Sequence, residues 1–385
     1  MDNQQRKKPA QREIRYCRLR GVVVAASLKA IASAAVLAFL AGSTAAQDQD
    51  EKPPGPAERL EARGLVRAGL VWITPVEAEL RQLLIDIRKQ HAEYRGVTRK
   101  FDQALKDNNQ QLALVKQARA EANELDRRID AGMASGALNV RQINQLTAEH
   151  NKRVDFVNSV GPGLYDPESK VNSLPLARLQ EERIELRNAV ILKLLKVDRI
   201  VGDVEASYVE FTDDEAIAAD VAEAGRNNRL GPTKVYTSDV RRLARARNDV
   251  LNEDNPVNRE DEEFRMWAIL NDEQSVQVTF DPESELRLLS AADADNLGIE
   301  IPDDVAEEML QVSDDKQVAG RPVTFASLRL GNQLLVDVTF HVLGDKDADL
   351  GSILGGKTLA PAQFQFQPEL LMLKVSGAEP ADVNN

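Results

Sequence analysis

The stretch that decides the fold is VTFDPESEL, which runs from Val278 to Leu286. Its first residues alternate in the manner of a β-strand with one buried face, and the strand then ends at an acidic turn, Asp281-Pro282-Glu283. A plain solvated β-turn with proline in its second position explains this ending. A loop that carries a catalytic carboxylate also explains it, so the rest of the chain has to separate the two readings.

The sequence around this stretch predicts a mostly β domain over residues 257–376. Short alternating segments follow one another there, separated by ND, DPES, GR, GN, GD and GG turn signals. The segments are FRMWAILN (264–271), SVQVTF (275–280), EEMLQVSD (307–314), RPVTFASLRLGN (321–332), LLVDVTFHVL (334–343) and AQFQFQPELLMLKV (362–375). Only AADADNLGI, residues 291–299, has the pattern of a short helix.

Upstream, residues 75–208 carry a helical pattern with a seven-residue repeat, which is typical of a coiled coil. One seam is Leu80, Ile87, Tyr94, Phe101, Asn108, Val115, Ala122 and Ile129, and the other is Val76, Leu83, Gln90, Val97, Ala104, Gln111, Ala118 and Leu125. The polar seam residues are expected to fix register and partner number. DAGMASGALN (130–139) and GPGLYDPESK (161–170) predict breaks, each followed by a further helix. The predicted all-α region is a coiled coil or helical hairpin, and pairing within the chain and between chains both remain open.

Residues 209–256 contain two shorter helical patches, and we expect them to form a helical linker to the β domain. Residues 47–74 are expected to be a polar, proline-rich linker followed by a short apolar segment, and residues 377–385 a disordered tail. The predicted fold is therefore an N-terminal helical region joined to a C-terminal mostly β domain.

The N-terminus predicts export. Residues 1–46 hold eight basic and two acidic residues, and a basic stretch precedes an apolar core and the small residues Thr44 and Ala46. This is the pattern of a signal peptide cleaved near Ala46, which places the mature chain in the periplasm or cell envelope without a membrane segment. The alternative is an uncleaved anchor over Val22 to Ala46.

The charge and the cysteine content limit the chemistry. The whole chain has a net charge of −13, which argues against a nucleic-acid partner. The only cysteine, Cys17, lies within the predicted signal peptide, so the mature chain has no disulfide, no thiolate metal site and no cysteine nucleophile. We expect no cofactor and no metal. His91 and His150 lie on helical faces as ordinary side chains, and the acidic groups near Asp281 and in GDKDADLG (344–351) are expected to be exposed turns rather than Ca²⁺ loops.

Three stretches, taken in order, resemble retropepsin-like aspartic proteases. They are VQVTFDPESELRLLS, AADADNLGIEI and the late series SLRLGN, VDVTFHVL, SILGG and FQFQPELLMLKV. Exported bacterial relatives in that family also carry a long helical or coiled-coil region before the protease-like domain. The resemblance implies that Asp281 falls on the catalytic aspartate, Pro282 on the following Thr/Ser and Glu283 on the glycine.

The same resemblance assigns two further features. Ile353-Leu354-Gly355 matches the late hydrophobic-hydrophobic-Gly motif, and a flap is expected between about Val312 and Val323, with Gly320 near its return. The scaffold motifs are thus present while the residues after the aspartate are altered.

These replacements predict a degenerate, inactive site. Aspartic proteolysis needs two carboxylates that share a proton, and with one matching turn a homodimer would have to supply the second. Pro282 lacks both a hydroxyl and a backbone N–H, and Glu283 adds a side chain and a charge where glycine is needed. The expected function is a scaffold whose β domain binds a protein or peptide. The alternatives are an active homodimeric endopeptidase that uses Asp281, and a purely structural coiled-coil protein.

Overall fold

The computed structural model describes residues 53–168, 174–252, 254–260, 263–302, 304–313, 316–331, 333–359 and 363–376. The predicted signal peptide and the C-terminal tail lie outside these residues. The helices and strands of the described residues all belong to one compact unit, Pro54–Asn385. Among the described residues, no helix is both long enough and apolar enough to cross a bilayer.

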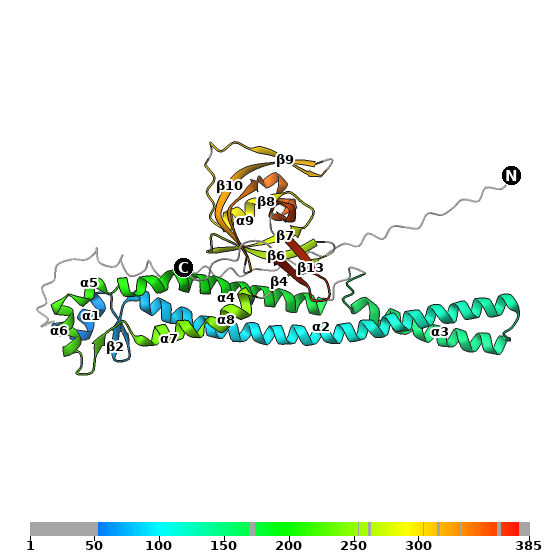
Figure 1. Ribbon diagram of the computed structural model, residues 1–385, viewed down its shortest axis with the longest axis horizontal. Helices are drawn as coiled ribbons and strands as arrows, with labels where there is room; N and C mark the ends of the chain where they lie inside the picture. The colour runs from blue at the N-terminus through cyan, green and yellow to red at the C-terminus, as the bar shows by residue number, and fades with distance from the viewer. Residues whose placement is uncertain are drawn as a thin grey trace, which may run out of the picture. The chain divides into compact units, whose positions relative to one another are not determined.

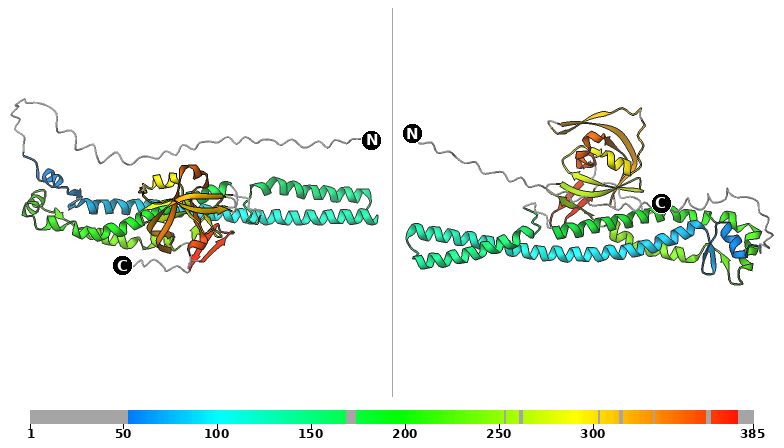
Figure 2. Two further views of the ribbon diagram at one scale, coloured as in Figure 1. Left: turned by 90° about the horizontal axis from the view of Figure 1, so that it is seen from above. Right: turned by 180° about the vertical axis from the view of Figure 1, so that it is seen from behind.

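Three helices form the main helical region (Figure 1): α2 (Pro75–Ser135), α3 (Val140–Val160) and α4 (Leu174–Ala206). Thr74 caps α2 by accepting a hydrogen bond from the Glu77 N–H, and Gly136 ends it in the left-handed conformation with φ 66°. Helix α2 packs against both α3 and α4, and Figure 2 shows both helices running along it. The chain therefore supplies partners for its own seams, an arrangement that the sequence left open.

The first predicted seam is buried at all eight positions, whereas Gln111 in the second seam is exposed. The buried polar residue of the first seam, Asn108, has a specific partner: its amide donates to the Tyr165 carbonyl and accepts from the Tyr165 N–H, each at 2.8 Å. Asn108 therefore holds the connection between α3 and α4, beside a short 3₁₀ turn, η1 (Gly161–Gly163). This role differs from the expected one, in which a polar seam residue selects the partner number of a coiled coil.

A small module lies at the start of α2, inside the stretch that was expected to be a linker. It contains α1 (Pro56–Ala62), β1 (Val66–Ala68), β2 (Val71–Ile73), α5 (Val209–Thr212), α6 (Glu215–Glu223) and β3 (Arg229–Leu230). Its core is Leu60, Leu65, Trp72, Ile217 and Val221. Residues 56–73 and 209–230 are separate in sequence, but β2 and β3 pair in parallel, so the two segments form one structure. Helices α7 (Lys234–Arg242) and α8 (Ala244–Leu251) then follow.

A buried carboxylate joins this module to the long helices. Glu77 is fully buried and accepts hydrogen bonds from the Tyr208 hydroxyl at 2.7 Å and from the Thr233 hydroxyl at 2.5 Å. Burial raises the pKa of the Tyr208 hydroxyl, so it remains a donor. Because all these partners are neutral, the carboxylate depends on hydrogen bonds rather than on an ion pair.

The C-terminal region is a β-barrel with an attached small sheet. Its elements are β4 (Asn255–Pro256), β5 (Asn258–Glu260), β6 (Glu263–Leu270), β7 (Gln274–Asp281), β8 (Arg287–Leu289), α9 (Ala291–Asn296), β9 (Glu308–Ser313), β10 (Lys316–Leu330), β11 (Gln333–Leu343), η2 (Asp345–Leu350), β12 (Ile353–Gly355), η3 (Gly356–Leu359), β13 (Gln363–Gln367) and β14 (Met372–Ser376). The eight-stranded sheet has the order β5-β6-β7-β12-β8-β11-β10-β9, and a further β6–β10 pairing closes it. A second sheet has the order β13-β14-β4. The predicted strands and the short helix at 291–299 are present.

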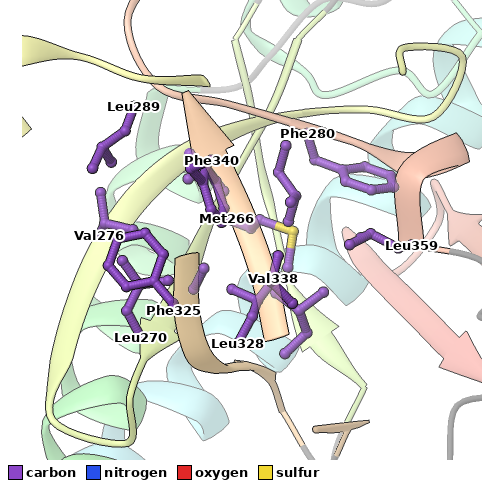
Figure 3. Close-up of a cluster of buried hydrophobic side chains, with 14 of the residues drawn as sticks. Met266, Leu270, Val276, Phe280, Leu289, Phe325, Leu328, Val338, Phe340 and Leu359 are labelled. Carbon is purple, nitrogen blue, oxygen red and sulfur yellow. The ribbon is translucent and has the colours of Figure 1, made fainter. Parts of the chain in front are cut away.

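Apolar side chains at alternate positions of the strands fill the interior of the barrel (Figure 3). Val276, Val278 and Phe280 of β7 are buried, and Phe280 lies among the core side chains of neighbouring strands. Phe325 and Phe340 meet edge to face with centroids 5.7 Å apart. Because the period of a strand is two, burial of Phe280 turns the next residue, Asp281, away from the core.

The helices and the barrel share buried contacts. Gln180 of α4 is fully buried and donates to the carbonyls of Val257 at 3.1 Å and Leu371 at 2.8 Å. The Tyr165 hydroxyl donates to the Pro368 carbonyl at 2.8 Å. Leu371 also packs in one apolar cluster with side chains of α2 and α4. The β region is therefore packed directly onto α2 and α4.

Candidate functional site

The acidic stretch Asp281-Pro282-Glu283 forms a turn at the end of β7. Asp281, Pro282 and Glu283 are all exposed. The Asp281 carboxylate accepts from the Glu283 N–H at 2.9 Å, and the Ser284 N–H donates to the Asp281 carbonyl at 3.3 Å. This is a β-turn with proline in its second position and an aspartate that caps its own loop. The Asp281 side chain thus accepts a hydrogen bond from within its own turn.

The late glycine motif supports this turn from behind. Strand β12 lies between β7, to which it is parallel, and β8, to which it is antiparallel, and Gly355 pairs with Asp281. The Gly355 N–H donates to the Leu286 carbonyl at 2.7 Å. A Cβ on Gly355 would lie 2.5 Å from the Ser284 carbonyl oxygen and 2.7 Å from that of Leu286, so only glycine fits. The fold therefore brings the acidic turn next to the motif Ile353-Leu354-Gly355.

A pocket of about 290 Å³ opens beside the turn. Its lining is Phe264, Thr279, Phe280, Asp281, Pro282, Ser284, Leu286, Val312 and Ile353. Most of these side chains are apolar, and Thr279, Asp281 and Ser284 provide polar groups. Val312 comes from β9, so the β9–β10 hairpin contributes to the wall of the pocket. Such a pocket suits an apolar group carried on a polar backbone.

The charges around the turn are mixed. The Glu283 carboxylate lies 3.4 Å from Lys357 Nζ, and both side chains are at least half exposed, so the pair contributes little to stability. Arg287 is the first residue of β8, which follows the turn. Burial lowers the pKa of its guanidinium, but an arginine stays charged at neutral pH. Within the described residues, no group of three or more His, Cys, Asp or Glu side chains could hold a metal ion.

Gly320 has a different place from the expected one at the return of a flap. It lies inside β10, where it pairs with Glu308 of β9 on one side and with Leu343 of β11 on the other. The chain reverses earlier, between Ser313 and Lys316. The β9–β10 hairpin does include the expected flap residue Val312, but Gly320 contributes by leaving space within the sheet rather than by making the turn.

The two histidines on helical faces have local partners. His91 Nε2 lies 2.9 Å from Asp249 Oδ2, and His150 Nδ1 lies 3.3 Å from the Asn151 side-chain oxygen. Asp249 also lies 3.8 Å from Arg95 Nε. These contacts are those of ordinary helical side chains.

Sequence reasoning missed several residues of the site. Phe264 and Leu286 line the pocket although their strand pattern marked them only as apolar. His341 lies 2.9 Å from Glu308 through its Nε2, a contact between residues 33 positions apart. No local spacing carries that information, because it arises from the pairing of three strands.

Comparison with known proteins yields a distant structural likeness. No family model matches the chain, and no curated protein matches it. The crystal structure of a retropepsin-like aspartic protease from Rickettsia conorii is similar, with 22% sequence identity and a TM-score of 0.25 over 31% of this chain and 86% of that chain. The C-terminal half of this chain is β-rich and contains a barrel.

Proposed function

We propose that the barrel is a retropepsin-like domain without proteolytic activity, and that it binds an extended segment of another protein at the Asp281 pocket. The helical region serves in this proposal as the scaffold that presents the barrel. The observation that carries the proposal is the apolar pocket of about 290 Å³ between the acidic turn and Val312 of the β9–β10 hairpin. The proposal also places the protein in the cell envelope, because the basic and then apolar N-terminal sequence has the pattern of a signal peptide.

An extended peptide fits this site for two reasons. Strand β9 is at the end of the eight-stranded sheet, and among the described strands it pairs only with β10, so its outer edge can accept another strand. Leu310 and Val312 of β9 are partly buried toward an apolar cluster, while Met309 is 65% exposed on the other face. An added strand would gain backbone hydrogen bonds from the edge, and the neighbouring pocket would select its side chain.

The chemistry at Asp281 supports binding rather than hydrolysis. The aspartate caps its own turn through the Glu283 N–H, and no second carboxylate of the described residues hydrogen-bonds to it. In a dimer, Glu283 would add further negative charge beside the shared pair. Like charges that are brought close together repel each other, at a cost that solvent screening lowers for an exposed side chain such as Glu283. Pro282 offers no N–H or hydroxyl to offset this cost.

Binding is tested with a library of fluorescent extended peptides measured by fluorescence polarisation. Val312→Lys places a charge in the pocket wall and is expected to weaken binding at least about tenfold, because an apolar contact is lost and a charge is desolvated. Val336→Lys is the matched control, since Val336 is 67% exposed on β11 and does not line the pocket. Equal affinities for the two variants would refute the pocket as the binding site.

The same preparation separates the alternatives. Asp281 is exposed and lines the pocket. Peptidase activity between pH 3 and 7 that is lost in Asp281→Asn would therefore support an endopeptidase that uses Asp281 instead. An absence of both peptide binding and hydrolysis would favour the purely structural reading. Light scattering on the mature chain shows whether a second copy is present in either case.

A further inference from the structure

Three strands place His341, Gly320 and Glu308 side by side on one face of the sheet. In the ladders, His341 of β11 lies opposite Pro322, two residues beyond Gly320 on β10, and Gly320 lies opposite Glu308 of β9. His341 Nε2 and Glu308 Oε2 are 2.9 Å apart. The imidazole therefore reaches past the middle strand to the edge strand.

The contact depends on glycine at position 320. A Cβ there would lie 2.9 Å from the His341 Cβ and 3.3 Å from Leu310 Cδ1. Any larger residue would fill the space through which the imidazole approaches β9. Glycine in a strand interior lowers stability, so its presence is explained by this close approach of a neighbouring side chain.

The bridge is attached to the strand that forms the pocket wall. Glu308 is the first residue of β9, and the next inward-facing side chains, Leu310 and Val312, pack in the cluster that also contains Leu286 and Ile353 of the pocket. Since β9 is the last strand in the sheet, β10 is its only strand neighbour among the described elements. A tie from β11 to β9 thus adds a second anchor to a strand that otherwise depends on one ladder.

We infer that His341 and Glu308 are positioning residues, which bridge over Gly320 and hold β9 against the Asp281 pocket. The inference rests on the proposed function only for what the pocket binds, because the bridge itself exists in the unbound protein. Other charged contacts hold the same hairpin: Arg321 Nε lies 3.7 Å from Glu307, and Lys316 Nζ lies 3.5 Å from Asp349. Neither reaches β11, so the His341 contact is the one that joins three strands.

Hydrogen–deuterium exchange of the β9 amides, measured on the full mature chain without peptide, tests the bridge. His341→Ala and Glu308→Ala are each expected to speed exchange in residues 309–313 about fivefold, and the double variant no more than either single one. His341→Gln keeps a side-chain N–H donor of similar reach and is expected to retain most of the protection. A merely structural role of the histidine ring would not be rescued by glutamine.

Thr339→Val is the matched control. Thr339 lies two residues before His341 on β11, and its hydroxyl lies 2.8 Å from that of Thr324 on β10. This variant removes a cross-strand hydrogen bond that does not involve β9, so β9 exchange should stay unchanged. Unchanged β9 exchange in His341→Ala, or fully additive effects of the two alanine variants, would overturn the inference.

The outcome is separable from that of the proposed function. If β9 responds as expected while no peptide binds any variant, the bridge stands and the binding proposal fails. If peptides bind at the Val312 site and β9 exchange is insensitive to His341 and Glu308, the binding proposal stands and the bridge fails.

Discussion

Replacement of Gly355 by alanine tests whether the acidic turn is built on the late glycine motif. The added Cβ would lie 2.5 Å from the Ser284 carbonyl oxygen, 2.7 Å from the Leu286 carbonyl oxygen and 2.8 Å from the Leu286 nitrogen. All three atoms belong to the backbone, so no side-chain rotation relieves the contacts. The turn or β12 has to move, and either movement disturbs the ladder between Gly355 and Asp281.

The expected cost can be worked from these contacts. Overpacking a well-packed site costs about 1–3 kcal/mol, and rigid backbone neighbours place this case near the upper end. Alanine also reduces the freedom of the unfolded chain, which returns about 0.4–1 kcal/mol. Gly355→Ala is therefore expected to lower the free energy of unfolding by about 2 kcal/mol.

Urea denaturation measures this change. The fluorescence of Trp267 in β6 reports on the barrel when the other tryptophan, Trp72, is replaced by phenylalanine. Gly344→Ala is the matched control, because a Cβ at Gly344 would meet no atom within 4 Å, and its cost is expected to stay within about 0.5 kcal/mol. Equal stability of the Gly355→Ala and Gly344→Ala variants would refute close packing of the motif beneath the Asp281 turn.

Two further substitutions probe the helical region. Glu77→Ala leaves the buried hydroxyls of Tyr208 and Thr233 without their acceptor, and it is expected to lower the free energy of unfolding by about 3 kcal/mol in urea denaturation, with Glu77→Gln costing less. Asn108→Ala removes both hydrogen bonds to the Tyr165 backbone and is expected to cost about 2 kcal/mol and to speed proteolytic cleavage within residues 161–168. A cost below about 0.5 kcal/mol for either alanine variant would contradict the assigned role.

The helical region was largely predictable because its signal is local. A seven-residue repeat identifies the face of a helix that is buried, and every position of the first seam is indeed buried. The repeat does not identify what covers that face. The partner depends on the connections at Gly136 and at Gly161–Gly163, and on the amide of Asn108, which holds the second connection through Tyr165.

The acidic turn was predictable for a similar reason, since turn chemistry and strand alternation act over a few residues. Gly320 shows where such reasoning ends. A glycine in a β-rich sequence is compatible with a hairpin return and with a close approach between strands. In the structure, Gly320 allows a close approach between strands, because His341 of a neighbouring strand lies against it. No local sequence pattern indicates that contact.

The contact between the helices and the barrel was the least predictable feature, and it bears on the choice among functions. The side-chain amide of Gln180 in α4 donates to the carbonyl of Leu371. Leu371 immediately precedes β14, which belongs to the small sheet. Strand β13 of that sheet places Phe364 against Phe280, with ring centroids 5.0 Å apart, and Phe280 lines the pocket immediately before Asp281. A cap that served only to join coiled-coil chains would need no continuous packing from a helix to a pocket wall. The arrangement therefore favours the proposed scaffold, in which the helices support the site where a peptide would bind.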